Sequence, residues 1–136
     1  MAASASPSIN WRLVAHGNAG GVADPLVGYV ALDRPSAAAF AARTGTTGLQ
    51  AVRRVDFARD ALVAVFGPFG CKDARVEVDS VAQRRGALAV RLRERRPAPG
   101  TAECMAIFET FRLLTVPKAV LQKPYPTRAT VTLARA

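Results

Sequence analysis

The strongest constraint on the fold of this chain is an unbroken apolar run from Leu62 to Phe66, which ends at Gly67. A half-exposed strand would alternate apolar and polar residues, so a continuous run of this length predicts a strand that is buried on both faces. The polar segment before the run, Val55–Asp60, predicts a turn that leads into this strand. We therefore expect the rest of the chain to cover both sides of a central strand.

The composition limits the size of the fold and the partners that suit it. With 136 residues, of which 50% are hydrophobic, the chain is expected to form one domain with a sizeable core. Its formal net charge of +9 suits an acidic partner, such as nucleic acid, anionic lipid or an acidic protein surface. The basic residues are scattered along the chain, so general solubility and surface charge explain the same excess.

The first residues of the sequence predict a flexible start before the domain. Residues 1–8 are small and polar, without the basic and apolar regions of a signal peptide. We expect them to form an N-terminal stub, followed by a single domain over 9–136. No segment has the ~18 to 20 consecutive apolar residues that span a bilayer. The stub suits a mature secreted protein and a cytoplasmic one equally.

One short helix is predicted near residues 34–43. Asp33 precedes an alanine-rich segment and can cap its first turn, because a carboxylate accepts hydrogen bonds from the free amide groups there. Phe40 is the only large apolar residue of this helix and is expected to anchor it on the sheet. Gly45 is expected to stop the helix. Residues 44–54 then form a mobile, polar connection.

The remaining segments predict strands. Alternating apolar residues indicate strands over about 9–16, 26–32 and 129–133, and a buried strand near 108–116. The sequence therefore predicts an α+β fold, a mostly antiparallel and barrel-like β-sheet sandwich with one short helix.

The hairpin over residues 76–92 is the best-specified element. Its apolar residues share one face when Val78 lies opposite Val90 and Val76 lies opposite Leu92. This register leaves residues 82–86 as the loop. It also sets Glu77 across from Arg91, a favourable pair of about 0.2–1 kcal/mol.

A series of short motifs follows in a fixed order along the second half of the chain. They are Val55-Asp56-Phe57, Leu62–Gly67, Gly70-Cys71, Val76-Glu77-Val78, Pro99-Gly100 with Cys104, and Thr115-Val116-Pro117-Lys118. The series resembles the C-terminal domain of the protease complex subunit PrcB family. The chain departs from that family at Pro68-Phe69-Gly70-Cys71, where many members have Thr-Gly-Gly-Tyr. It also has Phe108-Glu109-Thr110-Phe111 where an aromatic-proline-aromatic segment is usual.

The resemblance implies a non-catalytic accessory domain outside the cytoplasm, secreted or periplasmic. Such a domain binds another protein and stabilises or regulates a protease or an envelope complex, without a cofactor. Three alternatives stay open: a basic protein that binds nucleic acid or another polyanion, a loop-based protease inhibitor, and a structural subunit of a larger assembly. A cytoplasmic location is the alternative for the compartment.

The two cysteines, Cys71 and Cys104, are expected at the open end of the hairpin, where they form a disulfide or remain two buried thiols. Two cysteines and the lone His16 lack the spacing of a metal site, and nothing in the sequence sets His16 beside a nucleophile. We therefore expect no metal ligands and no catalytic residues.

Two surfaces are candidates for binding a partner. The first is the loop with Pro68, Phe69, Gly70 and Lys72, in which Phe69 is either an exposed contact residue or folded onto the core. The second is a basic face with Arg91, Arg93, Arg95 and Arg96, which is either a docking surface or a solvated sheet face. Nucleic acid is the less favoured partner, since most aromatic residues occupy core-like positions and stacking on bases needs exposed rings.

Overall fold

The computed structural model of the chain describes residues 8–19, 26–67, 75–95 and 110–135. Seven strands form one sheet. They are β1 (Arg12–Asn18), β2 (Val27–Ala31), β3 (Asp60–Gly67), β4 (Arg75–Arg84), β5 (Ala87–Arg95), β6 (Thr110–Pro117) and β7 (Arg128–Arg135). The α-helices are α1 (Arg34–Ala41) and α2 (Gly45–Arg53). Two short 3-10 helices are η1 (Ala42–Thr44) and η2 (Lys118–Val120).

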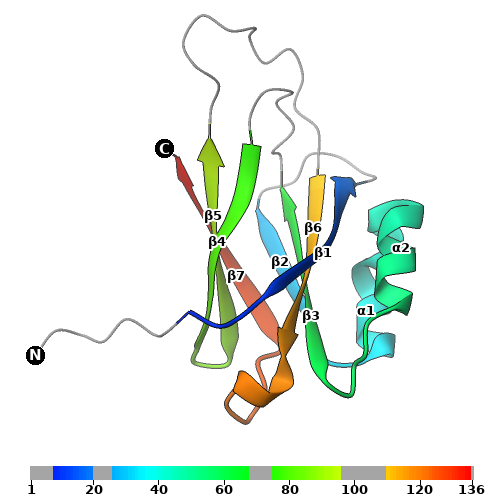
Figure 1. The fold of residues 1–136 in the computed structure, drawn as a ribbon, viewed down its shortest axis with the longest axis vertical. Coiled ribbons are helices and arrows are strands. Elements are labelled where there is room, and N and C mark those ends of the chain that lie inside the picture. Colours follow the sequence, from blue (N-terminus) through cyan, green and yellow to red (C-terminus); the bar gives the residue numbers. More distant parts are fainter. Residues whose placement is uncertain (1–7, 20–25, 68–74, 96–109, 136) are drawn as a thin grey trace, which may run out of the picture.

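The sheet has the order β1-β6-β3-β2-β7-β5-β4 and curls into a half-barrel (Figure 1). Neighbouring strands are antiparallel except β5 and β7, which run parallel. The helices α1 and α2 lie against one side of this sheet, at the right of Figure 1. The α+β class and the mostly antiparallel, barrel-like sheet predicted from the sequence are confirmed.

The central strand β3 is buried on both faces, as its apolar run predicts. Leu62, Ala64 and Phe66 belong to a core that they share with the helices, where Phe40 is 2% exposed. Ala61, Val63 and Val65 belong to a second core inside the half-barrel. Because successive side chains of a strand point to opposite faces, one apolar run supplies both cores.

The two outer strands, β1 and β4, do not pair with each other, and two hydrogen bonds reach β4 from the other end of the sheet. The backbone N–H of Ile9 donates to the Val81 carbonyl at 2.7 Å. The Nε of Arg112, on β6, donates to the Val76 carbonyl at 3.1 Å. Burial lowers the pKa of the Arg112 guanidinium. The sheet is therefore held in a curled form without a complete ring of strand pairs.

The helix predicted near residues 34–43 is present as α1, but the mobile connection predicted over 44–54 is wrong. Gly45 has a φ of 64°, which ends the first helical segment, and the chain then forms α2. Gly48 packs against Thr44, since a Cβ on Gly48 would lie 1.8 Å from the Thr44 hydroxyl oxygen. Val52 of α2 is buried in the core that includes Phe40, and this tertiary packing overrides the poor helix propensity of the segment 45–48.

The register predicted for the hairpin is also wrong. A tight turn at Arg85 and Gly86, both with positive φ, joins β4 and β5, and Val81 lies opposite Val90. Such a two-residue turn matches the twist of the strands better than the longer loop expected over 82–86. The register then shifts at Asp79, so that Val78 meets Leu92.

The shift at Asp79 keeps the apolar residues of both strands on the inner face. It also places Glu77 opposite Arg93 rather than Arg91. Sequence reasoning missed the shift because alternation alone does not show where an extra residue is inserted.

Strand β7 joins the hairpin to the rest of the sheet through a close approach to β2. Only two residue pairs connect β2 and β7, Gly28 with Ala129 and Tyr29 with Arg128. A Cβ on Gly28 would lie 2.8 Å from the Cγ2 of Val131, so this crossing requires glycine.

The end of α2 is held by a side chain from the start of α1. The guanidinium of Arg34 donates to the carbonyls of Val52 at 3.1 Å and Val55 at 3.2 Å. It also lies 5.4 Å from the centre of the Phe57 ring. A cation at a helix C-terminus satisfies free carbonyls and opposes the helix dipole, so Arg34 fixes α2 against α1.

We expect Arg34→Ala to lower the free energy of unfolding by about 1.5–3 kcal/mol, because charge-assisted bonds to half-buried carbonyls are lost. Chemical denaturation measures this loss. Arg53→Ala, at an exposed neighbouring position, is the control and should change stability by less than about 0.5 kcal/mol. Equal losses in both variants would contradict the role of Arg34.

The cap of α1 makes stability depend on pH. Hydrogen bonds from Ser36, through its side chain and its backbone N–H, lower the pKa of Asp33 below its ordinary value of 3.8. A carboxylate whose pKa is lowered in the folded state stabilises that state above its ordinary pKa, and this contribution is lost as the pH falls.

Asp33→Asn keeps an oxygen that accepts the Ser36 bond but does not titrate. The stability advantage of the natural chain over Asp33→Asn should be constant above about pH 5 and shrink below about pH 4. Denaturation series at several pH values measure this difference. An advantage that does not vary with pH would contradict the cap.

Candidate interaction surface

The residues predicted to bind a partner fall partly within the described structure. Pro68, Phe69, Gly70, Lys72 and Arg96 lie outside the described residues, as do Cys71, Cys104 and residues 1–7 of the stub expected over 1–8. The described residues next to these segments, Gly67 with Thr110 and Arg75 with Arg95, pair at the ends of their strands. A disulfide between Cys71 and Cys104 stays a prediction.

Two residues of the predicted basic face lie on the outer side of β4, β5 and β7. Arg91 and Arg93 are exposed there, while the side chain of Arg95 lies outside what the structure describes. The register of the three strands sets outward-facing residues in rows. These rows are Arg84, Ala87 and Arg128; Ala82, Ala89 and Thr130; and Ser80, Arg91 and Thr132.

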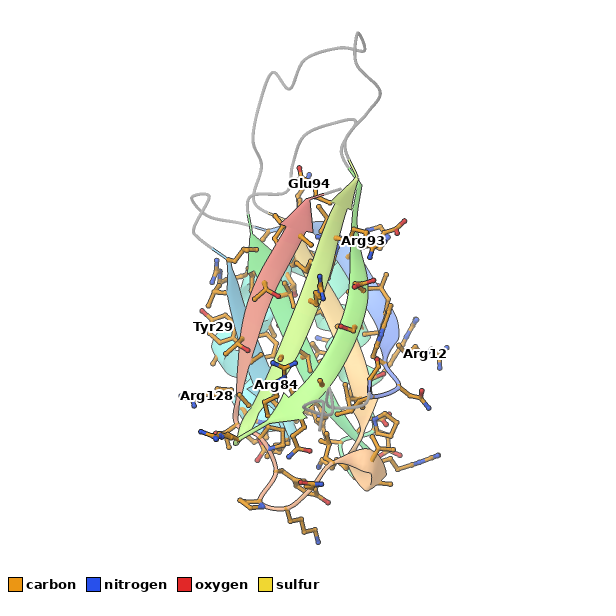
Figure 2. All side chains as sticks on the ribbon, turned by 90° about the vertical axis from the view of Figure 1, so that its left-hand side faces the viewer. Arg12, Tyr29, Arg84, Arg93, Glu94 and Arg128 are labelled. Atoms are coloured by element: carbon orange, nitrogen blue, oxygen red, sulfur yellow. The ribbon has the colours of Figure 1, made fainter. Side chains whose placement is uncertain are left out.

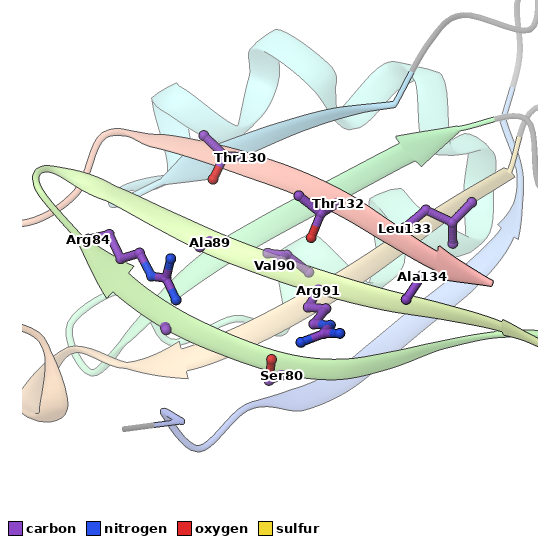
Figure 3. Close-up of a pocket in the computed structure, with 10 residues that line it drawn as sticks. Ser80, Arg84, Ala89, Val90, Arg91, Thr130, Thr132, Leu133 and Ala134 are labelled. Atoms are coloured by element: carbon purple, nitrogen blue, oxygen red, sulfur yellow. The ribbon is translucent and has the colours of Figure 1, made fainter. Parts of the chain in front are cut away.

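Small side chains form the floor of this face, and charged ones form its margins. The surface is hollowed between Ala82, Ala89 and the threonines of β7, with a volume of about 460 Å³. Figure 3 shows Arg84 and Arg91 extending across this hollow, with Ser80, Thr130 and Thr132 on the same side of the strands. We call the surface formed by Ser80, Arg84, Arg91, Arg93, Arg128, Thr130 and Thr132 the basic sheet face.

A carboxylate on the bulge of β4 faces two of these arginines. Asp79 lies 3.8 Å from the Nε of Arg91 and 3.6 Å from a terminal nitrogen of Arg93. The Arg91 side chain is 60% exposed, so this ion pair contributes little to stability.

The other two arginines of the basic sheet face have no such partner. Among the described residues, neither Arg84 nor Arg128 forms an ion pair. Figure 2 looks onto this side of the molecule, where Arg84 and Arg128 mark its lower part and Arg93 its upper part. The face therefore presents several cations and hydroxyl groups around an open hollow.

The sequence predicted Arg91 and Arg93 on this face but not Arg128, Thr130 and Thr132. Their alternation with Ala129 and Val131 indicates that they share one side of a strand. Only the parallel pairing of β7 with β5 places that side beside the hairpin. No local pattern in the sequence predicts this long-range pairing.

The histidine, His16, lies on β1 and is exposed. In the described ranges, no three side chains of His, Cys, Asp or Glu come together as a metal site needs. None of the helices in the described part of the chain has the length and apolar character that crossing a membrane requires.

Two of the motifs on which the resemblance to the PrcB family rests lie together in the structure and stabilise the fold. The Nζ of Lys118 donates to the Leu32 carbonyl at 2.8 Å and to the carbonyl of Phe57. Within the turn before β3, the backbone N–H of Ala58 donates to the Asp56 carboxylate at 3.1 Å. The Val-Asp-Phe and Val-Pro-Lys segments therefore tie the start of β3 to the end of β6.

No protein-family model, no curated protein and no solved structure matches the chain. The resemblance to the PrcB family accordingly rests on the order of the motifs and stays a prediction.

Lys118→Ala should lower the free energy of unfolding by about 1.5–3 kcal/mol, because two half-buried carbonyls lose a charged donor. Lys123→Ala, which removes an exposed lysine near the Tyr125 ring, is the matched control. Thermal or chemical unfolding of both variants measures the difference. A loss no larger than that of the control would show that Lys118 does not hold the turn.

Proposed function

We propose that this chain is a non-catalytic interaction domain that binds an acidic, extended segment of another protein on the basic sheet face. The observation that carries the proposal is the hollow between Arg84 and Arg91, with a floor of small residues and with Arg128 beside it. Guanidinium groups bind carboxylates well, because their fork of N–H donors matches the two carboxylate oxygens.

The spacing of the arginines favours a peptide over other acidic partners. Arg91 and Arg93 are two residues apart on one strand, which places them about 6.7 Å from each other along it. Alternate side chains of an extended acidic peptide repeat at the same distance. Alanines at positions 82 and 89 leave room for the peptide backbone to approach the sheet.

The absence of rings on this face argues against nucleic acid. The described rows of β4, β5 and β7 contain arginine, threonine, serine and alanine, but no aromatic residue. Proteins that bind single strands usually stack bases on exposed aromatic side chains. An acidic protein segment needs only the cations and hydroxyl groups that are present.

The resemblance to the PrcB family extends this proposal to a biological setting. In that setting the domain is secreted or periplasmic and serves as an accessory subunit that stabilises or regulates a protease or an envelope complex. The segments with Phe69 and Lys72 would add contacts to the same partner. Affinity capture from the native envelope fraction is the experiment that identifies it.

A direct test uses a fluorescent peptide of about ten residues, alternating Glu and Ser, in an anisotropy titration. We expect Arg84→Ala with Arg91→Ala to weaken binding about tenfold or more, the effect of losing at least one charge-assisted contact. The control is Arg53→Ala with Arg59→Ala, which removes the same charge from exposed positions elsewhere.

Equal losses in the two double variants would mean that net charge alone attracts the peptide, which contradicts a defined site. Single-stranded DNA serves as the competing probe. Tighter binding of DNA than of the peptide, with an affinity that falls steeply with salt, would favour the polyanion-binding alternative instead.

A further inference from the structure

Within the part of the chain that the structure describes, the outer edge of β1 is unpaired, although it lies beside a helix. In that part, β1 is the last strand of the sheet and pairs with β6 alone. Among the described residues, no other backbone group bonds to the backbone of residues 12–18. A strand edge with free N–H and C=O groups is a template for a further strand.

A groove of about 620 Å³ lies between β1 and α2. It is lined by consecutive residues of β1, from Arg12 to His16. The register of β1 shifts between Leu13 and Ala15, so the β1 residues that the groove touches lie around a bulge, and Thr115 of β6 and Asp60 of β3 line the groove as well. The opposite wall is α2, through Thr47, Gln50, Ala51 and Arg54.

Asp56 lines this groove and accepts a hydrogen bond from the Ala58 N–H, but several other polar groups of the groove lack partners within the described structure. Thr115, at its base, is 8% exposed, and its hydroxyl forms no hydrogen bond with another described residue. Arg12, Arg54 and Asp60 line the same end of the groove and form no ion pair among the described residues. A buried hydroxyl without a hydrogen-bond partner lowers the stability of the folded protein, unless a ligand or a water molecule forms that bond.

Both edge strands contain a bulge, but β4 also accepts hydrogen bonds from other segments of the chain. On β4, the carbonyls of Val76 and Val81 already accept bonds from Arg112 and Ile9. Charges and a bulge at Asp79 protect that edge further. β1 instead exposes an apolar side chain, since Leu13 is 43% exposed.

We propose that the groove between β1 and α2 binds an extended peptide segment of a partner protein, which pairs with β1 as an additional strand. The free groups of the β1 edge bind the peptide backbone. Arg12, Arg54 and Asp60 pair with its polar side chains, and Leu13 contacts an apolar one. α2 limits the groove to a single strand. This site is separate from the basic sheet face.

The experiment screens a phage-displayed library of random peptides of about ten residues for binding to the whole chain. Peptides that also bind the Gln50→Trp variant are removed by counter-selection. Gln50 is exposed on the α2 wall, so a tryptophan there fills the groove without entering the core. Leu49→Trp is the matched control, because Leu49 is 40% exposed on the same helix but does not line the groove.

We expect Gln50→Trp to weaken the selected peptide about tenfold or more, and Leu49→Trp to change its affinity less than about twofold. N-methylation of the peptide backbone should weaken binding at every second residue, because only alternate amides face β1. Arg84→Ala with Arg91→Ala should leave this affinity unchanged. If Gln50→Trp unfolds, Thr47→Trp on the same wall replaces it.

Three results would overturn the proposal. The first is a selection that enriches no peptide on the natural chain over Gln50→Trp. The second is a peptide whose binding does not respond to N-methylation, since side chains alone would then hold it. The third is self-association of the chain, measured by sedimentation, that Gln50→Trp abolishes, because a second copy would then occupy the β1 edge.

Discussion

The two-sided burial of β3 is the constraint on which the rest of the structure depends. Its alternate side chains supply the core beneath the helices and the core inside the half-barrel, so both layers form only when this strand is central. Fully buried apolar side chains each contribute about 1.5–3 kcal/mol relative to exposure. The segment from Ala61 to Phe66 has no polar side chain that could face solvent, so β3 cannot be an edge strand. It therefore pairs with β2 on one edge and with β6 on the other.

The elements that the sequence predicted are those whose signal is local. The apolar run of β3, the Asp33 cap and the alternation along β7 each determine their own structure from neighbouring residues. The errors arose where distant contacts decide. α2 is held by the burial of Val52 in the core and by the Arg34 bond to its end, and the shift at Asp79 accompanies the tight turn at Arg85 and Gly86. The parallel pairing of β5 with β7, which completes the basic sheet face, has no local signal at all.

The basic residues discussed above fall into two groups. Arg34, Arg112 and Lys118 donate to backbone carbonyls at the end of α2, on β4 and before β3, so they belong to the fold. Arg84, Arg91, Arg93 and Arg128 lie on the outer face instead, where Asp79 is the carboxylate that pairs with two of them. The net charge of +9 therefore does not by itself predict how strongly the chain binds an acidic partner. The cations that donate hydrogen bonds to backbone carbonyls are not available to that partner. The argument for an acidic partner depends on the second group alone.

Both proposed binding sites follow from a sheet that curls without closing. The bond from Ile9 to Val81 draws the start of the described chain to β4, after which β1 diverges towards α2 and its outer edge stays open. At the other end of the sheet, β7 is inserted between β2 and the hairpin, which brings its threonines beside Arg91. A fully closed barrel would pair β1 with β4 and remove the groove, because closure leaves no free strand edge. The incomplete closure is therefore the physical reason why this chain offers an exposed edge and a separate charged face on one core.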